Sequence, residues 1–272
     1  MNTTQDLPRF GYISWAALSD VGRRRKNNED SHGEWPEHGV FCVADGMGGA
    51  RDGEVASRIV VEHLSMEVKK WDRFSPPISL DDRLALIDQT LNAASAWIFE
   101  YAETHDAKGC GTTFVGVALD PEDATKAVAL HAGDSRLYRI RRKKIQLITR
   151  DHSVANMAGV KNEAELDPAF RNMILRAVGI NDTVELERTS FDIAADDWII
   201  ICSDGLSKMM DDSAIAKTVR EAKSEEQAVK ALIDEANRLG GKDNVTVVAL
   251  HAGNLPGKAR SMHRLQTTNW PK

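Results

Sequence analysis

Residues 113–148 have the sequence TFVGVALDPEDATKAVALHAGDSRLYRIRRKKIQLI, in which four short apolar runs alternate with turn residues. Only a few residues separate successive runs, as around Pro121 and across the basic segment Arg142–Lys144. A chain that joins two parallel strands needs a crossover of about a dozen residues or more, whereas antiparallel neighbours need only a turn. This stretch therefore predicts strands that pair antiparallel with one another.

Similar patterns predict the other elements of the chain. The nine predicted strands are Ile13–Leu18, Val40–Ala44, Thr113–Leu119, Lys126–His131, Leu137–Arg141, Ile145–Ile148, Glu185–Phe191, Trp198–Cys202 and Val245–His251. Apolar residues at three- and four-residue spacing predict two pairs of helices, Glu54–Lys70 with Leu80–His105 and Asp212–Ala222 with Glu225–Leu239. Strands with helical pairs between and after them fit one layered α+β domain. We expect this domain to span residues 1–253 and to be followed by an extension of unknown role over residues 254–272.

The composition of the 272-residue chain argues against several classes of protein. Its formal net charge of −6 disfavours a nucleic-acid-binding protein, which usually carries a basic excess. The three cysteines, Cys42, Cys110 and Cys202, show no paired spacing and suggest a reducing compartment. The N-terminus lacks the pattern of a signal peptide, and no apolar run approaches the roughly 20 residues that span a bilayer. These features predict a cytoplasmic protein without a membrane span.

Three aspartates stand at the ends of predicted strands. Asp45 and Asp204 each follow an apolar run and precede a glycine, and Asp243 leads into the last strand. Carboxylates that converge at the ends of sheets repel one another unless cations neutralise them. Mg²⁺ and Mn²⁺ prefer oxygen ligands, and two such ions about 3.5–4 Å apart activate a water and clamp a phosphate. A single Asp-Gly after a strand is more often a hairpin turn, so the pattern indicates an acidic metal site without naming a reaction.

Eight short segments, in their order along residues 11–251, resemble the motifs of the metal-dependent protein phosphatase family, also called type 2C. They are Arg25–Asp30 (RKNNED), Asp45–Gly49 (DGMGG), Gly111–Thr113 (GTT), Gly133–Tyr138 (GDSRLY), Thr149–Ser153 (TRDHS), Leu175–Gly179 (LRAVG), Ser203–Leu206 (SDGL) and Asp243–Thr246 (DNVT). The resemblance implies a four-layer α-β-β-α sandwich, in which two antiparallel sheets are flanked by helical pairs and metal ions lie at one end. It also implies a bacterial-type serine/threonine phosphatase.

The resemblance assigns the two core ions to four residues. Asp45 would bridge both ions, and the carbonyl of Gly46 would bind one of them. Asp204 and Asp243 would complete the second site. Either Mn²⁺ or Mg²⁺ fits these ligands, because both ions accept the same oxygen donors.

Further acidic residues are given secondary roles by the same resemblance. Glu29 and Asp30 would act mainly through water on the ions, with direct coordination open for one of them. Asp151 resembles the aspartate that, together with Asp204, holds a third and weaker ion. Asp134, in contrast, we expect to be a structural acid that pairs with Arg136 or with backbone donors.

The implied reaction is hydrolysis of phosphoserine and phosphothreonine in proteins by a metal-activated water at a binuclear centre, without a phospho-enzyme. Arg25 would grip the substrate phosphate, since a guanidinium offers paired donors in one plane, although it also lies in a basic run that water could simply solvate. Met47 stands where many animal members of the family carry the histidine that protonates the leaving alcohol, so a metal-bound water is the expected donor here. The partners implied are phosphorylated proteins, including a bacterial serine/threonine kinase that the enzyme opposes or the targets of that kinase.

Two other functions remain open at this point. One is a regulatory phospho-binding module that has lost turnover, and the other is a phosphohydrolase of small molecules. The presence of Asp45, Asp204 and Asp243 favours an enzyme over a decayed relative. The sequence does not identify the substrate protein, the partner kinase or the oligomeric state.

Overall fold

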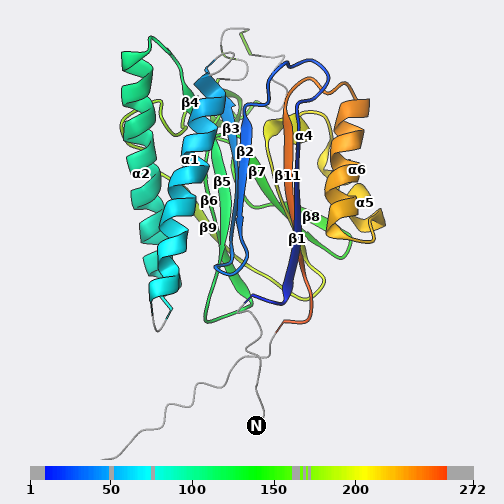
Figure 1. Ribbon diagram of the computed structural model, residues 1–272. Helices are drawn as coiled ribbons and strands as arrows, with labels where there is room; N and C mark the ends of the chain where they lie inside the picture. The colour runs from blue at the N-terminus through cyan, green and yellow to red at the C-terminus, as the bar shows by residue number, and fades with distance from the viewer. Residues whose placement is uncertain are drawn as a thin grey trace, which may run out of the picture.

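Two antiparallel sheets form the centre of the computed structural model (Figure 1), which describes residues 10–48, 52–74, 77–160, 166–167, 170 and 173–255. The first sheet has the strand order β1 (Ile13–Asp20), β11 (Val245–Ala252), β10 (Trp198–Cys202), β7 (Arg136–Arg141) and β8 (Lys144–Leu147). The second has the order β2 (Asp30–Trp35), β3 (Val40–Met47), β5 (Phe114–Leu119), β6 (Lys126–Ala132) and β9 (Glu187–Asp192), and β4 (Gly111–Thr112) pairs with the end of β3. The pairs of neighbouring strands are antiparallel. The short connections predicted this for β5 with β6 and for β7 with β8, whereas β6 and β7, which were expected to pair as well, lie in different sheets.

A pair of long helices covers the outer face of each sheet (Figure 1). The second sheet carries α1 (Asp52–Val68) and α2 (Leu80–Thr104), and the first carries α5 (Asp212–Glu221) and α6 (Glu225–Arg238). Shorter helical segments are η1 (Lys69–Arg73), α3 (Val154–Met157) and α4 (Asp204–Ser207). The four-layer α-β-β-α sandwich is therefore confirmed, with the four long helices close to their predicted bounds.

Three buried apolar clusters fill the spaces between the four layers. Strand β3 contributes to two of them, with Phe41 and Val43 in the cluster between the sheets and Cys42 and Ala44 in the cluster under α1 and α2. Successive side chains of a strand point to opposite faces, so a strand that is covered on both faces is apolar at every position. This explains why the run that leads to Asp45 is continuous rather than alternating.

Two strands carry no apolar run and were not predicted. Strand β2, with the sequence DSHGEW, is polar at most positions and lies at the edge of the second sheet. An edge strand pairs on one side only and tolerates charged residues, so its sequence lacks the pattern of a buried strand. Strand β4 is two residues long and is too short for any pattern.

The ends of the chain are only partly covered by the structure. The predicted extension over residues 254–272 lies outside the described residues from residue 256 onward, and the single-domain boundary stays a prediction. Among the described helices, none is both long and apolar enough to cross a membrane.

Candidate active site

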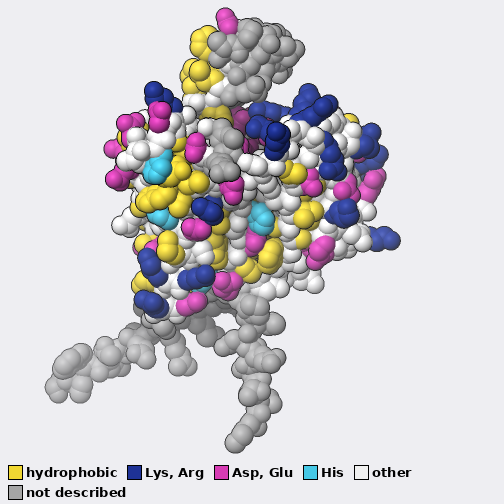
Figure 2. All heavy atoms as spheres, turned by 45° about the horizontal axis from the view of Figure 1, so that its top comes forward, with side chains coloured by type: hydrophobic (Ala, Val, Ile, Leu, Met, Phe, Trp, Pro, Cys, Tyr) yellow, Lys and Arg dark blue, Asp and Glu magenta, His cyan; other side chains and the backbone are white. Residues whose placement is uncertain are grey.

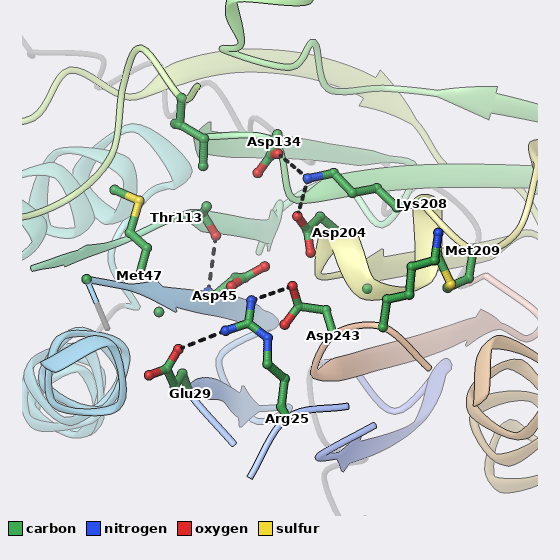
Figure 3. A pocket seen from close by; sticks show the side chains of 15 residues that line it. Arg25, Glu29, Asp45, Met47, Thr113, Asp134, Asp204, Lys208, Met209 and Asp243 are labelled. Atoms are coloured by element: carbon green, nitrogen blue, oxygen red, sulfur yellow. Dashed lines mark hydrogen bonds and ion pairs between the residues drawn. The ribbon is translucent and has the colours of Figure 1, made fainter. Parts of the chain in front are cut away.

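A cavity of about 890 Å³ opens at the end of the sandwich where β3 ends and α4 begins, the upper end in Figure 1. Acidic and basic side chains line it together: Glu29, Asp45, Asp134, Asp204 and Asp243, with Arg25, Lys208 and Lys242. Figure 2 brings this end forward and shows Lys and Arg side chains gathered on part of it, and Figure 3 shows the cavity from close by. The three strand-end aspartates singled out in the sequence therefore meet in one place.

Asp45 and Gly46 lie at the end of β3 and are held there by backbone contacts. The Asp45 N–H donates to Thr113 Oγ1 (3.1 Å), and the Thr113 N–H donates to the Asp45 carbonyl (2.8 Å). The Gly46 N–H donates to the Glu29 carbonyl (3.1 Å). A Cβ atom on Gly46 would lie 2.2 Å from the carbonyl oxygen of Gly53 in α1, a distance that no side chain tolerates. Glycine at position 46 therefore lets α1 and the Glu29 segment close on the end of β3.

Asp204 and Asp243 line the cavity and lie on two segments of the chain that hydrogen bonds of Ser203 hold together. The Ser203 N–H donates to the Thr246 carbonyl (3.1 Å), and the Thr246 N–H donates to Ser203 Oγ (3.0 Å). These bonds link the residue before α4 to the start of β11. Ser203 is thus a structural residue at the site, and its hydroxyl is already engaged with the scaffold.

Asp30 lies behind the cavity and is not part of its lining. Its Oδ2 accepts hydrogen bonds from Ser203 Oγ (2.8 Å) and Thr246 Oγ1 (2.7 Å), whereas its Oδ1 is buried without a hydrogen-bond partner among the described residues. Burial, together with repulsion from nearby aspartates, raises the pKa of Asp30 to about 7 although both hydroxyl hydrogen bonds act to lower it. The carboxyl group therefore ties β2 to the two segments that carry Asp204 and Asp243.

The crowded carboxylates of the cavity disfavour one another's charge. Burial raises the pKa of Asp45 well above its usual value, and the charges of the four neighbouring aspartates raise it further. Burial also raises the pKa of Asp134 to about 6, with repulsion from Asp204 as the next cause. The acidic donors are all oxygen atoms, and Oδ1 of Asp30 and Oδ1 of Asp134 are buried without a hydrogen-bond partner among the described residues. This donor set fits hard divalent cations, whose charge would relieve the repulsion.

Arg25 lies at the mouth of the same cavity, on the side of Asp243 (Figure 3). Its Nη2 donates to Asp243 Oδ2 (2.8 Å), and its Nη1 lies 3.8 Å from Glu29 Oε2. The side chain is 48% exposed, so part of the guanidinium remains open to a ligand. Of the four basic residues 23–26, Arg25 is the member that lines the cavity, and its role in binding the substrate phosphate stays a prediction.

Asp134 and Asp151 have other neighbours in the structure than were expected from the sequence. Arg136 forms a two-pronged ion pair with Asp151, through Nε (2.9 Å) and Nη2 (2.6 Å), and Asp151 lines a separate cavity of about 270 Å³. Asp134 instead lines the main cavity with Asp204. The expected pairing of Asp134 with Arg136 is therefore wrong, whereas the alternative of a backbone hydrogen bond to Asp134 is present. The role of Asp151, with Asp204, as a ligand of a third ion stays a prediction.

Lys208 is a residue of the site that the sequence motifs did not reveal. Its Nζ lies 2.6 Å from Asp204 Oδ2 and 3.5 Å from Asp134 Oδ2 (Figure 3). The only signal in the sequence is its position four residues after Asp204, which places both side chains on one face of a helical turn. Met47 also lines the cavity, and its thioether has no proton to donate.

A second group of potential metal ligands lies away from this cavity. His131, His152 and Glu187 each offer a ligand atom within 4.8 Å of the others. The two imidazole rings, however, are stacked with centroids 4.5 Å apart and planes inclined by 9°. Nitrogen lone pairs lie in the plane of each ring, so in this arrangement they cannot converge on one ion. His131 Nε2 bonds to the Arg150 carbonyl (2.9 Å) and His152 Nε2 to Glu187 (3.0 Å), which fits a packing role.

Comparison with known proteins supports a phosphatase. The family described as protein phosphatase 2C matches residues 22–238. A putative 2C-type protein phosphatase of Streptococcus pyogenes serotype M6 is 33% identical over 241 residues, which cover 86% of this chain and 95% of that protein. The serine/threonine phosphatase Stp of Listeria innocua is 29% identical, with 89% and 96% covered. The crystal structure of the catalytic domain of the phosphatase PstP with two manganese ions is similar with a TM-score of 0.75 and 31% identity, over 89% of this chain and 99% of that one.

Proposed function

Because this chain belongs to the protein phosphatase 2C family, it is a metal-dependent phosphatase of phosphoserine and phosphothreonine in proteins, and we propose that the cavity around Asp45 is its active site. The observation that carries this proposal is the meeting of Asp45, Asp204 and Asp243 with Arg25 in one cavity. The three carboxylates come from three separate segments of the chain. Their convergence at one point serves no packing purpose, and it leaves repulsion that bound cations would relieve.

We assign two Mn²⁺ or Mg²⁺ ions to the oxygen atoms of Asp45, Asp204 and Asp243 and to the Gly46 carbonyl. When bound, two ions of this kind supply an acidified water as the nucleophile and neutralise the charge of the phosphate oxygens. The two manganese ions of the related PstP structure support the number. Glu29 lines the cavity and fits the role of a hydrogen-bond acceptor for water at the ions, whereas Asp30 acts from behind by fixing the segments that carry the ligands.

Arg25 is the group that positions the substrate. Its guanidinium is held by Asp243 at one edge and by Glu29 more loosely, and it remains half exposed at the cavity mouth. A phosphate that enters between Arg25 and Asp45 would accept hydrogen bonds from the free guanidinium N–H groups. Met47 contributes no proton to the leaving alcohol, and no histidine is among the lining residues that the structure describes, so we assign this proton to water.

The cellular setting is part of the proposal. A relative named as a serine/threonine phosphatase and another named as a putative 2C-type protein phosphatase support phosphorylated proteins as substrates. We place the enzyme opposite a serine/threonine kinase whose targets it dephosphorylates. Its three cysteines are buried and free, which fits a reducing compartment such as the cytoplasm.

The test is hydrolysis of a phosphothreonine peptide with Mn²⁺, with and without a chelator, by the natural protein and by Asp204→Ala. We expect the chelator to abolish release of phosphate and the substitution to lower the rate by about 10²-fold or more, as loss of a charge-stabilising group does. Asp234→Ala is the matched control, because Asp234 is an exposed residue of α6 that forms an i,i+4 ion pair with Lys230. Turnover without metal, or full activity of Asp204→Ala, would overturn the proposal.

Two further outcomes separate the competing functions. Tight binding of the phosphopeptide without release of phosphate would identify a regulatory phospho-binding module. Hydrolysis of small phosphate esters with no turnover of phosphorylated protein would identify a small-molecule phosphohydrolase.

A further inference from the structure

Lys208 connects two carboxylates of the cavity on the side opposite Arg25 (Figure 3). Its ammonium group lies 2.6 Å from Asp204 Oδ2 and 3.5 Å from Asp134 Oδ2. The side chain of Asp134 is 9% exposed and that of Lys208 38%, so the ion pair lies at the edge of the cavity with its acidic end buried. Each end of the acidic cluster is therefore faced by a basic side chain, Arg25 at Asp243 and Lys208 at Asp204.

The backbone fixes Lys208 in this position. The Lys208 N–H donates to the Asp204 carbonyl (2.8 Å), which closes the turn of α4 and places the two side chains on one face. This is the i,i+4 arrangement in which an acidic residue precedes a basic one on a helix, the more favourable of the two orders. The turn itself is packed tightly, since a Cβ on Gly205 would overlap the carbonyl oxygen of Asn244. The scaffold thus fixes the backbone of Lys208 one turn after Asp204, and from there its ammonium group reaches both carboxylates.

Asp134 needs a positive charge that the two ions of the proposed centre do not directly supply. It is not among the ligands assigned to those ions, yet it lies near Asp204, and its Oδ1 is buried without a hydrogen-bond partner among the described residues. Two carboxylates in such a site disfavour each other's charge unless a cation lies between them. An additional divalent ion between Asp134 and Asp204 would provide that charge, but the Lys208 ammonium already contacts both groups.

We propose that Lys208 is a built-in cation of the active site, which holds Asp134 beside Asp204 and keeps a third divalent ion from binding between them. The ion pair uses one of the two carboxylate oxygens of Asp204, Oδ2, so Lys208 is compatible with the two-ion centre. The inference rests on the proposed function, because it gives a role to Asp134, the aspartate of the same cavity that is not assigned to either core ion. Lys208 is a positioning residue in this scheme.

The test is the number of Mn²⁺ ions that each protein binds, measured from the free-Mn²⁺ signal in electron paramagnetic resonance during a titration to millimolar metal. We expect two ions for the natural protein and three for Lys208→Met, the third bound more weakly than the other two. Lys208→Arg keeps the charge and should stay at two. The control is Lys230→Met, which removes an exposed lysine from another i,i+4 ion pair with an aspartate and should also stay at two.

The double variant Lys208→Met/Asp134→Asn shows where an added ion binds. Removal of the Asp134 charge should return the number of bound ions from three to two. Three ions in the natural protein, two in Lys208→Met, or three in the double variant would each overturn the inference about Lys208. Failure of the natural protein to bind Mn²⁺ would instead overturn the proposed two-ion centre. Thermal unfolding checks that each variant is folded. If Lys208→Met does not fold, Lys208→Gln, which keeps a polar side chain of similar reach, replaces it in the same comparison.

Discussion

A Cβ atom on Gly205 would lie 1.9 Å from the carbonyl oxygen of Asn244, so the first turn of α4 is in direct backbone contact with the residue that precedes β11. Gly205 follows Asp204, and Asn244 follows Asp243. The contact therefore sets the separation of two of the aspartates to which we assign the metal ions. The Asn244 side chain is fixed as well, since its Nδ2 donates to the carbonyls of Val21 (3.0 Å) and Asn27 (2.9 Å).

Gly205→Ala should damage both stability and metal binding. The overlapping atoms belong to the backbone of Asn244, so α4 must move to accept a methyl group. Overpacking of this kind typically costs about 1–3 kcal/mol of unfolding free energy. Thermal unfolding and an Mn²⁺ titration should show a lower Tm and a weaker affinity. Gly253→Ala is the control, because its Cβ would meet only the Tyr12 carbonyl oxygen at 3.3 Å. An unchanged Mn²⁺ affinity in Gly205→Ala would contradict this role of the contact.

Asp151→Asn should lower stability without changing the number of bound ions. Asp151 is engaged by Arg136 through two N–H groups at 2.9 and 2.6 Å, and it lies in a cavity separate from that of Asp204. Loss of hydrogen bonds to a charged partner typically costs about 1.5–3 kcal/mol. Urea unfolding measures that cost, and Mn²⁺ titration counts the ions. A reduced count of bound ions in Asp151→Asn would support Asp151 as a metal ligand.

The order of the motifs along the chain did not predict which side chains Asp134 and Asp151 contact. Strands β7 and β8 return antiparallel on each other, and the Leu137 N–H donates to Thr149 Oγ1 (3.1 Å). This pairing carries Asp151 back beside Arg136, whereas Asp134 stays at the end of the sheet next to the cavity. Both strands were predicted, but the partner of Arg136 depends on register and side-chain direction, which the motifs do not state.

A strand could be predicted from the sequence only where burial gives it a clear pattern of apolar residues. Strand β3 is apolar on both faces because it is covered on both, so its pattern ends unmistakably at Asp45. Strand β2 is an edge strand with polar positions, and it carries Asp30 without any such signal. Lys208 was missed for a related reason: its role depends on Asp134, which is distant in sequence and meets it only after the sheets have formed.

Arg25→Ala should weaken phosphopeptide hydrolysis much more than Arg24→Ala. Arg25 lines the cavity and bonds to Asp243, whereas its neighbour Arg24 is exposed and does not line it. Loss of a charge-stabilising donor typically lowers the rate by about 10²–10³-fold. Steady-state kinetics on a phosphothreonine peptide should show a fall in kcat/KM of that order for Arg25→Ala and little change for Arg24→Ala. Equal effects of the two substitutions would indicate that the basic run acts only through its overall charge.

Asp30 and Asp134 should lower the free energy of unfolding of the metal-free protein as the pH rises from 5 to 8, and the buried imidazoles of His38 and His131, whose pKa burial lowers, act in the opposite direction. Burial raises the pKa of Asp30 to about 7 and that of Asp134 to about 6 in the folded protein, whereas an unfolded aspartate has a pKa of ~3.9. At these two carboxyl groups the folded state therefore binds more protons than the unfolded state over this window. The stabilisation from these protons is complete below about pH 4 and is lost as the pH rises through the folded-state values. Urea unfolding in the presence of a chelator should give a lower midpoint at pH 8 than at pH 5.

Asp30→Asn should reduce this difference between the two midpoints, because an amide keeps an acceptor for Ser203 and Thr246 but carries no charge that burial penalises. Mn²⁺ should reduce the difference as well, since it neutralises the same cluster. Asp234→Asn, on the exposed face of α6, should leave the difference as it is in the natural protein. An Asp30→Asn variant with the full pH dependence would show that the buried carboxyl of Asp30 is not the source of the pH dependence, which would then lie with the residues that line the cavity.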